Sequence, residues 1–432
     1  MTTLLWKIDD TTVDVNIQRY LAGDDVLLDR YLLPYDIEAT IAHVEGLKSI
    51  GALTSSESNS LVEALHDLRT RFERGDFVLD ERFEDCHSAI EFDLTDHLGD
   101  LGKKVHLGRS RNDQVLVAQR LFIQATLRSL HAALKIGAHA CLDLAQQEHD
   151  SVMPGYTHLQ RAVPSTIGFW LAGIAEGWIE DLSLLRMTFT WLNANPLGTA
   201  AGYGVNLPLD RDLTTNTLGF DRILINGLHA QNSRGKHEMQ ALQTCWHILQ
   251  DVRRFMWDLS LFCTSEFDFV RMGQEATTGS SIMPNKRNPD LVELMRGAIA
   301  PIAGAMSELQ NLLSLPSGYH RDLQMTKGPV IRGLLHTLRT VELLPCLLGS
   351  ISFNREAMRD TIDPELHATD RAVEAALRGI PFRDAYRQAA AFDYESDQRT
   401  PQQSTEARCS PGGCGNLMLD QLRHRLENEF LD

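Results

Sequence analysis

Four polar, glycine-bearing segments hold most of the side chains in this sequence that could carry out chemistry. They cover residues 106–114, 154–161, 273–290 and 318–327, and helical patterns separate them. Loops held by a rigid scaffold often carry binding and catalytic residues, so each segment is a candidate site. Capped or solvated turns have a similar composition, and this structural interpretation competes with the functional one in every case.

The first segment, 106–114, reads His-Leu-Gly-Arg-Ser-Arg-Asn-Asp-Gln and stands directly before the longest helical pattern. Its arginine, serine and asparagine side chains concentrate hydrogen-bond donors at a helix N-terminus, where anions bind readily. Helix caps commonly have the same composition. The segment alone therefore indicates an anion site and a capped turn about equally.

The second segment, 154–161, reads Pro-Gly-Tyr-Thr-His-Leu-Gln-Arg. His158 is a candidate general acid or base, because histidine is the side chain that titrates nearest neutrality. The chain has 16 histidines, however, and most of them must be structural or exposed. By itself this segment gives only weak support for a catalytic site.

The third segment, 273–290, is long and polar and has almost no apolar anchor in its first half, so we expect it to be mobile. It carries Ser280 and Ser281, followed by Lys286 and Asn288 at the start of a helix. We expect Asn288 to be the N-cap of that helix, ahead of a proline at the first position. A flexible linker is the competing interpretation, but a linker has no need of Lys-Arg-Asn-Pro at the beginning of a helix.

The fourth segment, 318–327, is another polar connection between helical patterns. Its side chains include Tyr319, Arg321, Gln324 and Lys327, which could line a substrate cleft. A solvated loop explains the same composition, so this segment also leaves both interpretations open.

Several familiar catalytic patterns are missing from the sequence. It has no G-x-S-x-G, H-E-x-x-H or G-x-x-x-x-G-K motif, and no G-x-G-x-x-G that opens a helix. No C-x-x-C pair supports a zinc or dithiol site. Hydrolase, metalloprotease, nucleotidase and dehydrogenase functions therefore lack support.

The composition disfavours several classes of partner. With 41 Lys and Arg against 58 Asp and Glu, the formal net charge is −17, and such a surface repels the phosphate backbone of nucleic acids. An anionic substrate would need local lysines or arginines in its cleft. No apolar run is long enough to span a membrane, and the opening residues lack a signal-peptide pattern. Together with seven scattered cysteines, these features predict a cytoplasmic protein that binds neither nucleic acid nor a membrane.

Long helices must position these segments. Residues 112–152 contain no proline, and apolar residues recur there at three- and four-residue steps. The other long helical patterns cover 165–195, 236–271, 290 onward and 330–348. We expect Pro301 to kink or interrupt the fourth pattern. Strand signals are sparse, so we predict an all-α bundle whose helices pack between subunits as well as within one.

The chain is long enough for two or three domains, since it has 432 residues of which 43% are hydrophobic. We expect an N-terminal helical domain over 1–105, a central long-helix bundle over 106–350 and a small C-terminal helical domain over 351–432. Residues 398–416 are rich in Gln, Ser, Pro and Gly, which predicts a flexible loop within the last domain.

The motifs and their order resemble the fumarase/aspartase superfamily, and within it the argininosuccinate lyase family. Residues 279–289 match the superfamily signature G-S-S-x-M-P-x-K-x-N-P at every fixed position. Residues 108–114 and 155–160 match the lyase motifs G-R-S-R-N-D-Q and G-Y-T-H-L-Q. Residues 84–91 resemble E-D-x-H-x-x-x-E, and the last loop, 319–327, resembles Y-x-x-D-L-Q-x-x-K.

The resemblance implies an all-α, three-domain subunit of the fumarase/aspartase type. Its long central bundle would join three others in the core of a homotetramer, and loops from three different subunits would build each active site. It also implies acid–base chemistry without a metal ion or cofactor. Two segments, 21–25 and 195–203, depart from the family pattern and affect the expected substrate contacts.

The resemblance further implies a reaction, the reversible elimination of fumarate from argininosuccinate to give L-arginine through an aci-carboxylate intermediate. Ser280 matches the base that removes the proton, and His158 matches the acid that protonates the departing nitrogen, although the sequence leaves the reverse assignment open. Lys286 would stabilise the intermediate, Glu293 would be the partner of the histidine, and His87 would support the site.

The same resemblance assigns substrate binding to a set of polar side chains in the four segments. These are Ser110, Arg111, Asn112, Thr157, Gln160, Ser281, Asn288, Tyr319, Gln324 and Lys327. Tyr319 and Gln324 would lie on the arginine side of the substrate. Arg109 and Arg321 are expected to form structural ion pairs.

Two alternatives compete with this assignment. Another superfamily lyase, such as adenylosuccinate lyase, fumarase or aspartase, would share the Ser280 loop but should lack the first two lyase motifs in these forms. A catalytically silent, crystallin-like structural protein is the second alternative. Such a protein has no need to keep Ser280, His158, Lys286 and Glu293, all of which are present.

Overall fold

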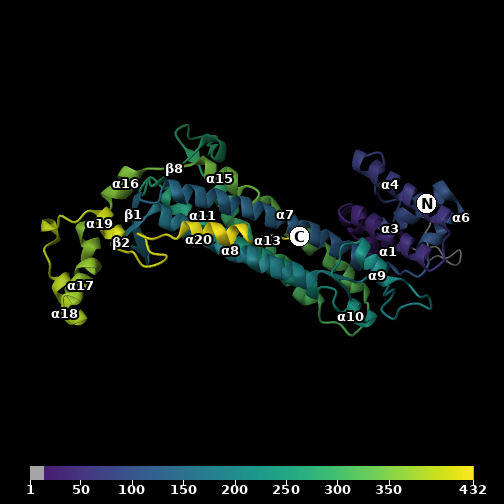
Figure 1. The fold of residues 1–432 in the computed structure, drawn as a ribbon. Coiled ribbons are helices and arrows are strands. Elements are labelled where there is room, and N and C mark those ends of the chain that lie inside the picture. The colour runs from purple at the N-terminus through teal and green to yellow at the C-terminus, as the bar shows by residue number, and fades with distance from the viewer. Residues whose placement is uncertain (1–13, 432) are drawn as a thin grey trace. The chain divides into compact units, whose positions relative to one another are not determined.

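The computed structural model describes residues 14–431, which are predominantly helical (Figure 1). The strands are short and form two-stranded pairs, so the predicted all-α class is confirmed. Residues 1–13, on which the signal-peptide prediction rests, lie outside the described range. Within residues 14–431, no helix combines the length and the apolarity that crossing a membrane requires.

The chain folds into two compact units, each of which collects segments from distant parts of the sequence. Unit 1 contains the described part of Met1–Ser129 together with Met187–Cys245 and Pro301–His336. Unit 2 contains Leu130–Arg186, Trp246–Ala300 and the described part of Thr337–Asp432. The division into 1–105, 106–350 and 351–432 stays a prediction.

The long helices contribute residues to both units, because the unit boundaries fall inside them. These helices are α7 (Arg111–Gln147), α8 (Ile167–Leu192), α11 (Lys236–Phe262), α13 (Ile299–Leu312) and α14 (Lys327–Val341). With 37 residues, α7 is about 55 Å long. The helix predicted over 112–152 is therefore confirmed, and it ends at Gln147, just before a hairpin.

Unit 1 surrounds the beginning of α7 with shorter helices. They are α1 (Val15–Ala22), α2 (Asp25–Asp29), α3 (Leu33–Ser49), α4 (Ser55–Arg74), α5 (Cys86–Leu98), α6 (Asp100–Lys103), α9 (Arg211–Thr217) and α10 (Gly227–Asn232). Two short parallel strands, β3 (Ala194–Asn195) and β4 (Arg222–Ile223), complete the unit. The shorter helices expected in the N-terminal hundred residues are thus present.

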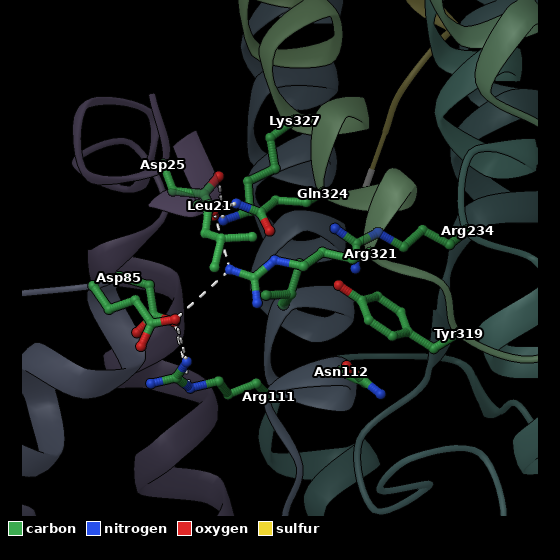
Figure 2. A pocket seen from close by; sticks show the side chains of 12 residues that line it. Leu21, Asp25, Asp85, Arg111, Asn112, Arg234, Tyr319, Arg321, Gln324 and Lys327 are labelled. Carbon is green, nitrogen blue, oxygen red and sulfur yellow. Dashed lines mark hydrogen bonds and ion pairs between the residues drawn. The ribbon is translucent and has the colours of Figure 1, made fainter. Parts of the chain in front are cut away.

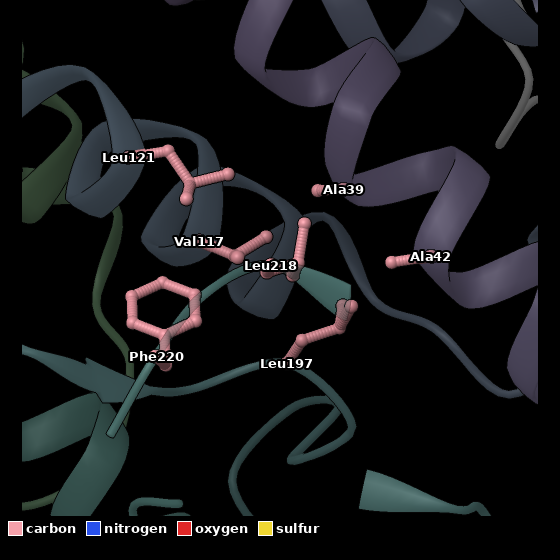
Figure 3. Packing of buried hydrophobic residues seen from close by; sticks show 7 residues of the cluster. All are labelled: Ala39, Ala42, Val117, Leu121, Leu197, Leu218 and Phe220. Carbon is pink, nitrogen blue, oxygen red and sulfur yellow. The ribbon is translucent and has the colours of Figure 1, made fainter. Parts of the chain in front are cut away.

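A buried apolar cluster in unit 1 fixes the start of α7 (Figure 3). It consists of Ala39, Ala42, Val117, Leu121, Leu197, Leu218 and Phe220. The first two belong to α3 and the next two to α7, so the cluster joins these helices to the chain around β3 and α9. Each large apolar side chain buried in this way contributes about 1.5–3 kcal/mol of transfer free energy.

Unit 2 consists of the remaining helices and three strand pairs. Its own helices are α12 (Asp290–Gly297), α15 (Leu344–Ser350), α16 (Arg355–Asp360), α17 (Ala368–Leu377), α18 (Phe382–Ala390), α19 (Pro401–Glu406) and α20 (Leu419–Glu427). The antiparallel pairs are β1 (Val152–Thr157) with β2 (Gln160–Thr166), β5 (Val270–Met272) with β8 (Ile351–Phe353), and β6 (Thr278–Gly279) with β7 (Arg287–Asn288).

The long helices pack directly on one another within unit 2. The Cys141 thiol of α7 donates to the Leu171 carbonyl of α8 at 3.3 Å, and both residues lie in this unit. The Trp170 indole of α8 donates to the carboxylate of Asp258 in α11 at 2.8 Å. These contacts join α7, α8 and α11 within the unit that also carries the two hairpins described below.

Three of the predicted helices end earlier or divide. The helix expected over 236–271 ends at Phe262, since the chain beyond it enters β5. The helical pattern that begins at residue 290 is interrupted between α12 and α13, just before Pro301, as expected. The single helix predicted over 330–348 is wrong, because α14 ends at Val341 and α15 begins at Leu344 with Pro345 in its first turn. Proline fits there because the first helical N–H groups have no intrahelical partner.

The stretch predicted as a flexible loop, 398–416, contains the helix α19 and is therefore partly ordered. Thr400 and Gln403 form a capping box at its start, in which the Thr400 hydroxyl accepts the Gln403 N–H at 3.2 Å. Reciprocal capping of this kind satisfies two of the free N–H groups at a helix start.

Candidate active site

A polar pocket of about 150 Å³ lies within unit 1 (Figure 2). Both acidic and basic side chains line its wall. The lining residues are Leu21, Asp25, Glu84, Asp85, Arg111, Asn112, Val115, Arg234, Tyr319, Arg321, Gln324 and Lys327. Two of the four polar segments singled out in the sequence, 106–114 and 318–327, meet in this pocket together with the Glu84 motif.

The first turn of α7 carries Arg111 and Asn112 into the pocket and is firmly anchored. The Asp113 carboxylate accepts the Ser110 N–H at 2.9 Å through one oxygen. Its other oxygen accepts the N–H groups of Gly198 and Ala200 at 3.1 and 2.9 Å. Segment 195–203, which departs from the family pattern, is therefore tied to the helix start by a buried carboxylate.

Lys327 lines the pocket and forms a buried charged contact. Its ammonium is 2.7 Å from Asp29 Oδ1 and 3.2 Å from Asp25 Oδ1. Burial lowers the pKa of Lys327, but the charges of Asp29 and Asp25 raise it above its usual value, so the side chain is a cation. Burial raises the pKa of Asp25 to about 6, although the Lys327 charge opposes the rise.

Glu84 contacts two arginines of the pocket lining. Its Oε1 is 3.0 Å from Arg111 Nη1 and 3.8 Å from Arg321 Nη2. Arg321 and Gln324 also donate to the backbone carbonyl of Leu21, each at 3.0 Å. Segment 21–25 therefore contributes a main-chain acceptor and the Asp25 carboxylate to the pocket.

His87 lies behind the pocket on α5 rather than in its lining. Its Nδ1 is 2.6 Å from Asp36 Oδ2, and both side chains are buried. Burial lowers the pKa of His87, but the charge of Asp36 and the hydrogen bond to it raise the pKa above its usual value. The histidine therefore braces α5 against α3, which is consistent with a supporting role.

His158 occupies a strained position at the tip of the β1–β2 hairpin in unit 2. It has a φ of 55°, and the next residue, Leu159, has a φ of 58°. Thr157 and Gln160 are paired on either side, so the turn has two central residues, both left-handed. Such turns usually contain Asn and Gly, because the left-handed conformation is sterically unfavourable for most other residues. Non-glycine residues held in this way cluster at functional sites.

The Ser280 loop joins β6 to β7 in the same unit and comprises residues 280–286. The Ser280 hydroxyl accepts the N–H groups of Ile282 and Met283 at 3.3 and 3.0 Å. Ser281 and Lys286 are exposed on this loop. The predicted N-cap role of Asn288 is wrong, because Asn288 pairs with Thr278 across β7 and β6, and Pro289 precedes α12.

The structure brings some of the predicted residues together and leaves others on separate elements. Arg111, Asn112, Tyr319, Gln324 and Lys327 share the unit 1 pocket, with Ser110 beside it. His87 lies behind this pocket on α5. The other predicted residues belong to unit 2 and comprise Thr157, His158 and Gln160 on one hairpin, Ser280, Ser281, Lys286 and Asn288 on another, and Glu293 in α12. Within the described part of unit 2, no hydrogen bond or ion pair joins the His158 hairpin to the Ser280 loop or to Glu293.

Of the two arginines predicted to form structural ion pairs, Arg109 forms none among the described residues and Arg321 forms one. The Arg109 guanidinium is buried and donates to the Thr40 hydroxyl at 2.8 Å and to the Val105 carbonyl at 3.0 Å. Across the described residues it has no carboxylate within 4.0 Å, so it is structural but not ion-paired. Arg321 does contact Glu84, at 3.8 Å, and it also lines the pocket.

Val115 and Arg234 line the pocket without having been singled out in the sequence. Val115 follows Arg111 by one helical turn, and this spacing could have identified it. Arg234 stands between α10 and α11 in an ordinary Asn-Ser-Arg-Gly sequence, and only the tertiary fold shows that it is buried.

Comparison with known proteins shows the family of this chain. The lyase family matches residues 16–304 of the chain. An argininosuccinate lyase from Xanthomonas campestris pv. campestris (strain B100) is 52% identical over 428 residues, which cover 99% of either chain. An argininosuccinate lyase from Stenotrophomonas maltophilia (strain K279a) is also 52% identical, over 98% of this chain and 99% of the relative.

Solved structures show the same fold at lower identity. EDDS lyase in complex with formate superposes with a TM-score of 0.80 at 23% identity, covering 97% of this chain and 91% of that one. The 3-carboxy-cis,cis-muconate lactonizing enzyme from Pseudomonas putida gives a TM-score of 0.70 at 17% identity, covering 96% and 97%. The family match and the identity across the whole chain confirm the resemblance seen in the motifs. The chain belongs to the lyase family of the fumarase/aspartase superfamily, and within it to the argininosuccinate lyases.

Proposed function

We propose that the protein is a carbon–nitrogen lyase that reversibly eliminates fumarate from argininosuccinate and releases L-arginine. The observation that carries this proposal is the 52% identity to proteins named argininosuccinate lyase over 99% of the chain. The motifs that distinguish these lyases within the superfamily, at 108–114 and 155–160, are intact.

The elimination removes a proton from the carbon next to a carboxylate and breaks the bond between the neighbouring carbon and the guanidino nitrogen. The charge spreads into that carboxylate as an aci-carboxylate, so cations and N–H donors placed there stabilise the transition state. Lys286 and Asn288 are suited to this task because they follow Ser280 on one hairpin. We propose that Lys286 stabilises the intermediate. The substrate carboxylate would be bound by Asn288, Ser281 and the backbone N–H groups of the loop.

Ser280 is the proposed base. A serine hydroxyl ionises far above neutrality and acts as a base only in a pocket rich in positive charge and donors. In the present conformation its oxygen already accepts two backbone N–H groups, those of Ile282 and Met283. Donors of this kind favour the ionised oxygen. Closure of the exposed loop over the substrate would exclude water and bring Lys286 to the same centre.

His158 is the proposed acid, which protonates the departing nitrogen. Its left-handed backbone holds the imidazole at the tip of a hairpin, beside Thr157 and Gln160, which we assign to substrate binding. Glu293, exposed in the first turn of α12, is the proposed partner that would raise the basicity of the histidine. The remaining substrate contacts are assigned to Ser110, Arg111, Asn112, Tyr319, Gln324 and Lys327.

We further propose that the active protein is a cytoplasmic homotetramer whose active sites are shared between subunits. Support comes from the distribution of the candidate residues, because no hydrogen bond or ion pair joins the His158 hairpin to the Ser280 loop within the described part of unit 2. One substrate needs both groups, and a neighbouring copy can supply the missing one.

Ultraviolet absorbance tests the proposal, because fumarate has a conjugated double bond that argininosuccinate lacks. Purified protein is mixed in parallel with argininosuccinate, adenylosuccinate, malate and aspartate. The proposal predicts a rise with argininosuccinate alone. A rise with one of the other compounds would replace the substrate assignment, and silence with all of them would favour a structural protein.

A further inference from the structure

Arg234 is a buried cation in the unit 1 pocket. Only 2% of its surface is exposed, and its Nε has no hydrogen-bond partner among the described residues. No carboxylate oxygen among residues 14–431 lies within 4.0 Å of its guanidinium. The neighbouring cations differ, since Arg111 and Arg321 contact Glu84 and Lys327 contacts two aspartates. A buried charge is costly unless it is paired, so Arg234 is poised to receive an anion from outside the chain.

The fold holds Arg234 in a fixed place. Its N–H donates to the Gln231 carbonyl at 3.2 Å at the end of α10. The guanidinium lies over the Tyr319 ring, with 5.5 Å between Cζ and the ring centroid. The Asn232 side chain accepts the Gly318 N–H at 2.8 Å and so ties the Tyr319 loop to the Arg234 segment. A site arranged in advance loses less entropy when a ligand binds.

The same pocket offers an unsatisfied acceptor. Glu84 Oε2 is buried and has no hydrogen-bond partner, while its Oε1 contacts Arg111 and Arg321. Figure 2 shows Arg234 and Tyr319 entering the pocket on one side, while Asp85 and Arg111 lie on the other. The pocket therefore presents an unpaired cation and an unpaired carboxylate oxygen to the same space. This combination is complementary to a zwitterion.

We propose that Arg234 binds the α-carboxylate of the amino-acid end of the substrate, an inference that rests on the proposed lyase function. The succinyl end is a dianion and has no positive group, so it could not satisfy the free carboxylate oxygen of Glu84. The amino-acid end carries an ammonium group beside its carboxylate, so it can satisfy Glu84 and Arg234 together. Arginine is well suited to the second contact, because its planar fork of donors matches a carboxylate.

The first test uses the synthetic direction, in which arginine and fumarate are separate substrates. Arg234→Met should raise the KM for arginine by roughly 10- to 100-fold, as expected for a lost charge-assisted hydrogen bond, and leave the KM for fumarate nearly unchanged. Arg234→Lys should recover part of the loss. Arg128→Met is the matched control, because Arg128 lies 4.5 Å from the Phe189 ring but does not line the pocket. An equal rise in both KM values would overturn the proposal.

The second test does not depend on turnover and uses agmatine, which is arginine without its α-carboxylate. Calorimetry should show that the wild type and Arg128→Met bind arginine more tightly than agmatine, and that Arg234→Met binds the two alike. A preference for arginine that survives in Arg234→Met, or is absent from the wild type, would contradict the proposal. The wild type could also fail to make argininosuccinate and still prefer arginine to agmatine. If Arg234→Met then lacks that preference and Arg128→Met keeps it, the proposed reaction fails and Arg234 still binds the α-carboxylate.

Discussion

The ammonium of Lys327 lies 2.7 Å from Asp29 Oδ1, and both side chains are almost completely buried. One residue opens α14 and the other ends α2, so this ion pair joins segments almost three hundred positions apart. Lys327 lines the unit 1 pocket, so this ion pair ties the pocket wall to α2.

Removing one partner of this pair should be costly. We expect Lys327→Met to lower the free energy of unfolding by about 3–5 kcal/mol, because Asp29 is left as an uncompensated buried charge. Urea unfolding at a fixed protein concentration measures the change. Arg332→Met is the control, since the Arg332–Glu308 pair is about half exposed and should contribute about 0–1 kcal/mol. Equal stability of Lys327→Met and the wild type would show that the ion pair does not hold the pocket.

A second ion pair predicts the pH dependence at the base of the His158 hairpin. Glu148 is buried and accepts two hydrogen bonds from the Arg355 guanidinium, and its carbonyl accepts the Gly168 N–H beyond the hairpin. Burial raises the pKa of Glu148, but the bonds from Arg355 and Ser151 lower it below the usual 4.5. Because the folded-state pKa is lowered, its contribution to stability is present above pH 4.5 and is lost as pH falls through the folded value.

Glu148→Gln should therefore reduce stability by about 1.5–3 kcal/mol at neutral pH. The difference in stability between this variant and the wild type should shrink as the pH is lowered below 4.5. Urea unfolding at a series of pH values measures this difference. Glu308→Gln, at an exposed pair, should show little difference at any pH. A gap between wild type and Glu148→Gln that widens in acid would rule out this account of the pair.

The turn at the tip of the hairpin allows function to be separated from structure. Asparagine adopts the left-handed conformation readily, so His158→Asn should keep the turn and leave the melting temperature unchanged. Activity should fall by about 100- to 10,000-fold, the usual contribution of a general acid. Steady-state rates and thermal melts measure the two effects. Full activity in a folded His158→Asn protein would remove His158 from the mechanism.

Much of this fold could be predicted because its signals are local. The absence of proline between Asn112 and Val152, together with the regular apolar spacing, is sufficient to predict α7. The helix α19 was missed, although Thr400 and Gln403 have the spacing of a capping box and Pro401 suits a first helical position. The composition of the surrounding loop outweighed that short signal.

The pocket could be predicted only in part. Motif spacing identified Arg111, Tyr319 and Lys327 because the family pattern fixes their types. The burial of Arg234 could not be predicted, since it depends on how the chain after α10 meets the Tyr319 loop. Likewise, nothing in the sequence shows that Asp113 accepts two N–H groups from a segment more than eighty positions away.

Shared active sites predict complementation between inactive subunits. We expect His158→Asn and Ser280→Ala to be inactive alone. When the two are unfolded together in equal amounts and refolded, about one site in four should receive both intact residues if these come from different subunits of a closed oligomer. Enzyme assays and sizing chromatography of the mixture measure this recovery. Complete absence of activity in well-folded hybrids would mean that one chain supplies both residues.

The central claim is most directly tested by following fumarate absorbance after purified protein is mixed with argininosuccinate, with wild type and Ser280→Ala compared side by side. The account predicts a steady rise for the wild type, an equal yield of arginine, and no rise for a Ser280→Ala protein with an unchanged melting temperature. A wild-type protein that releases no fumarate, or a Ser280→Ala protein that retains full activity, would contradict it.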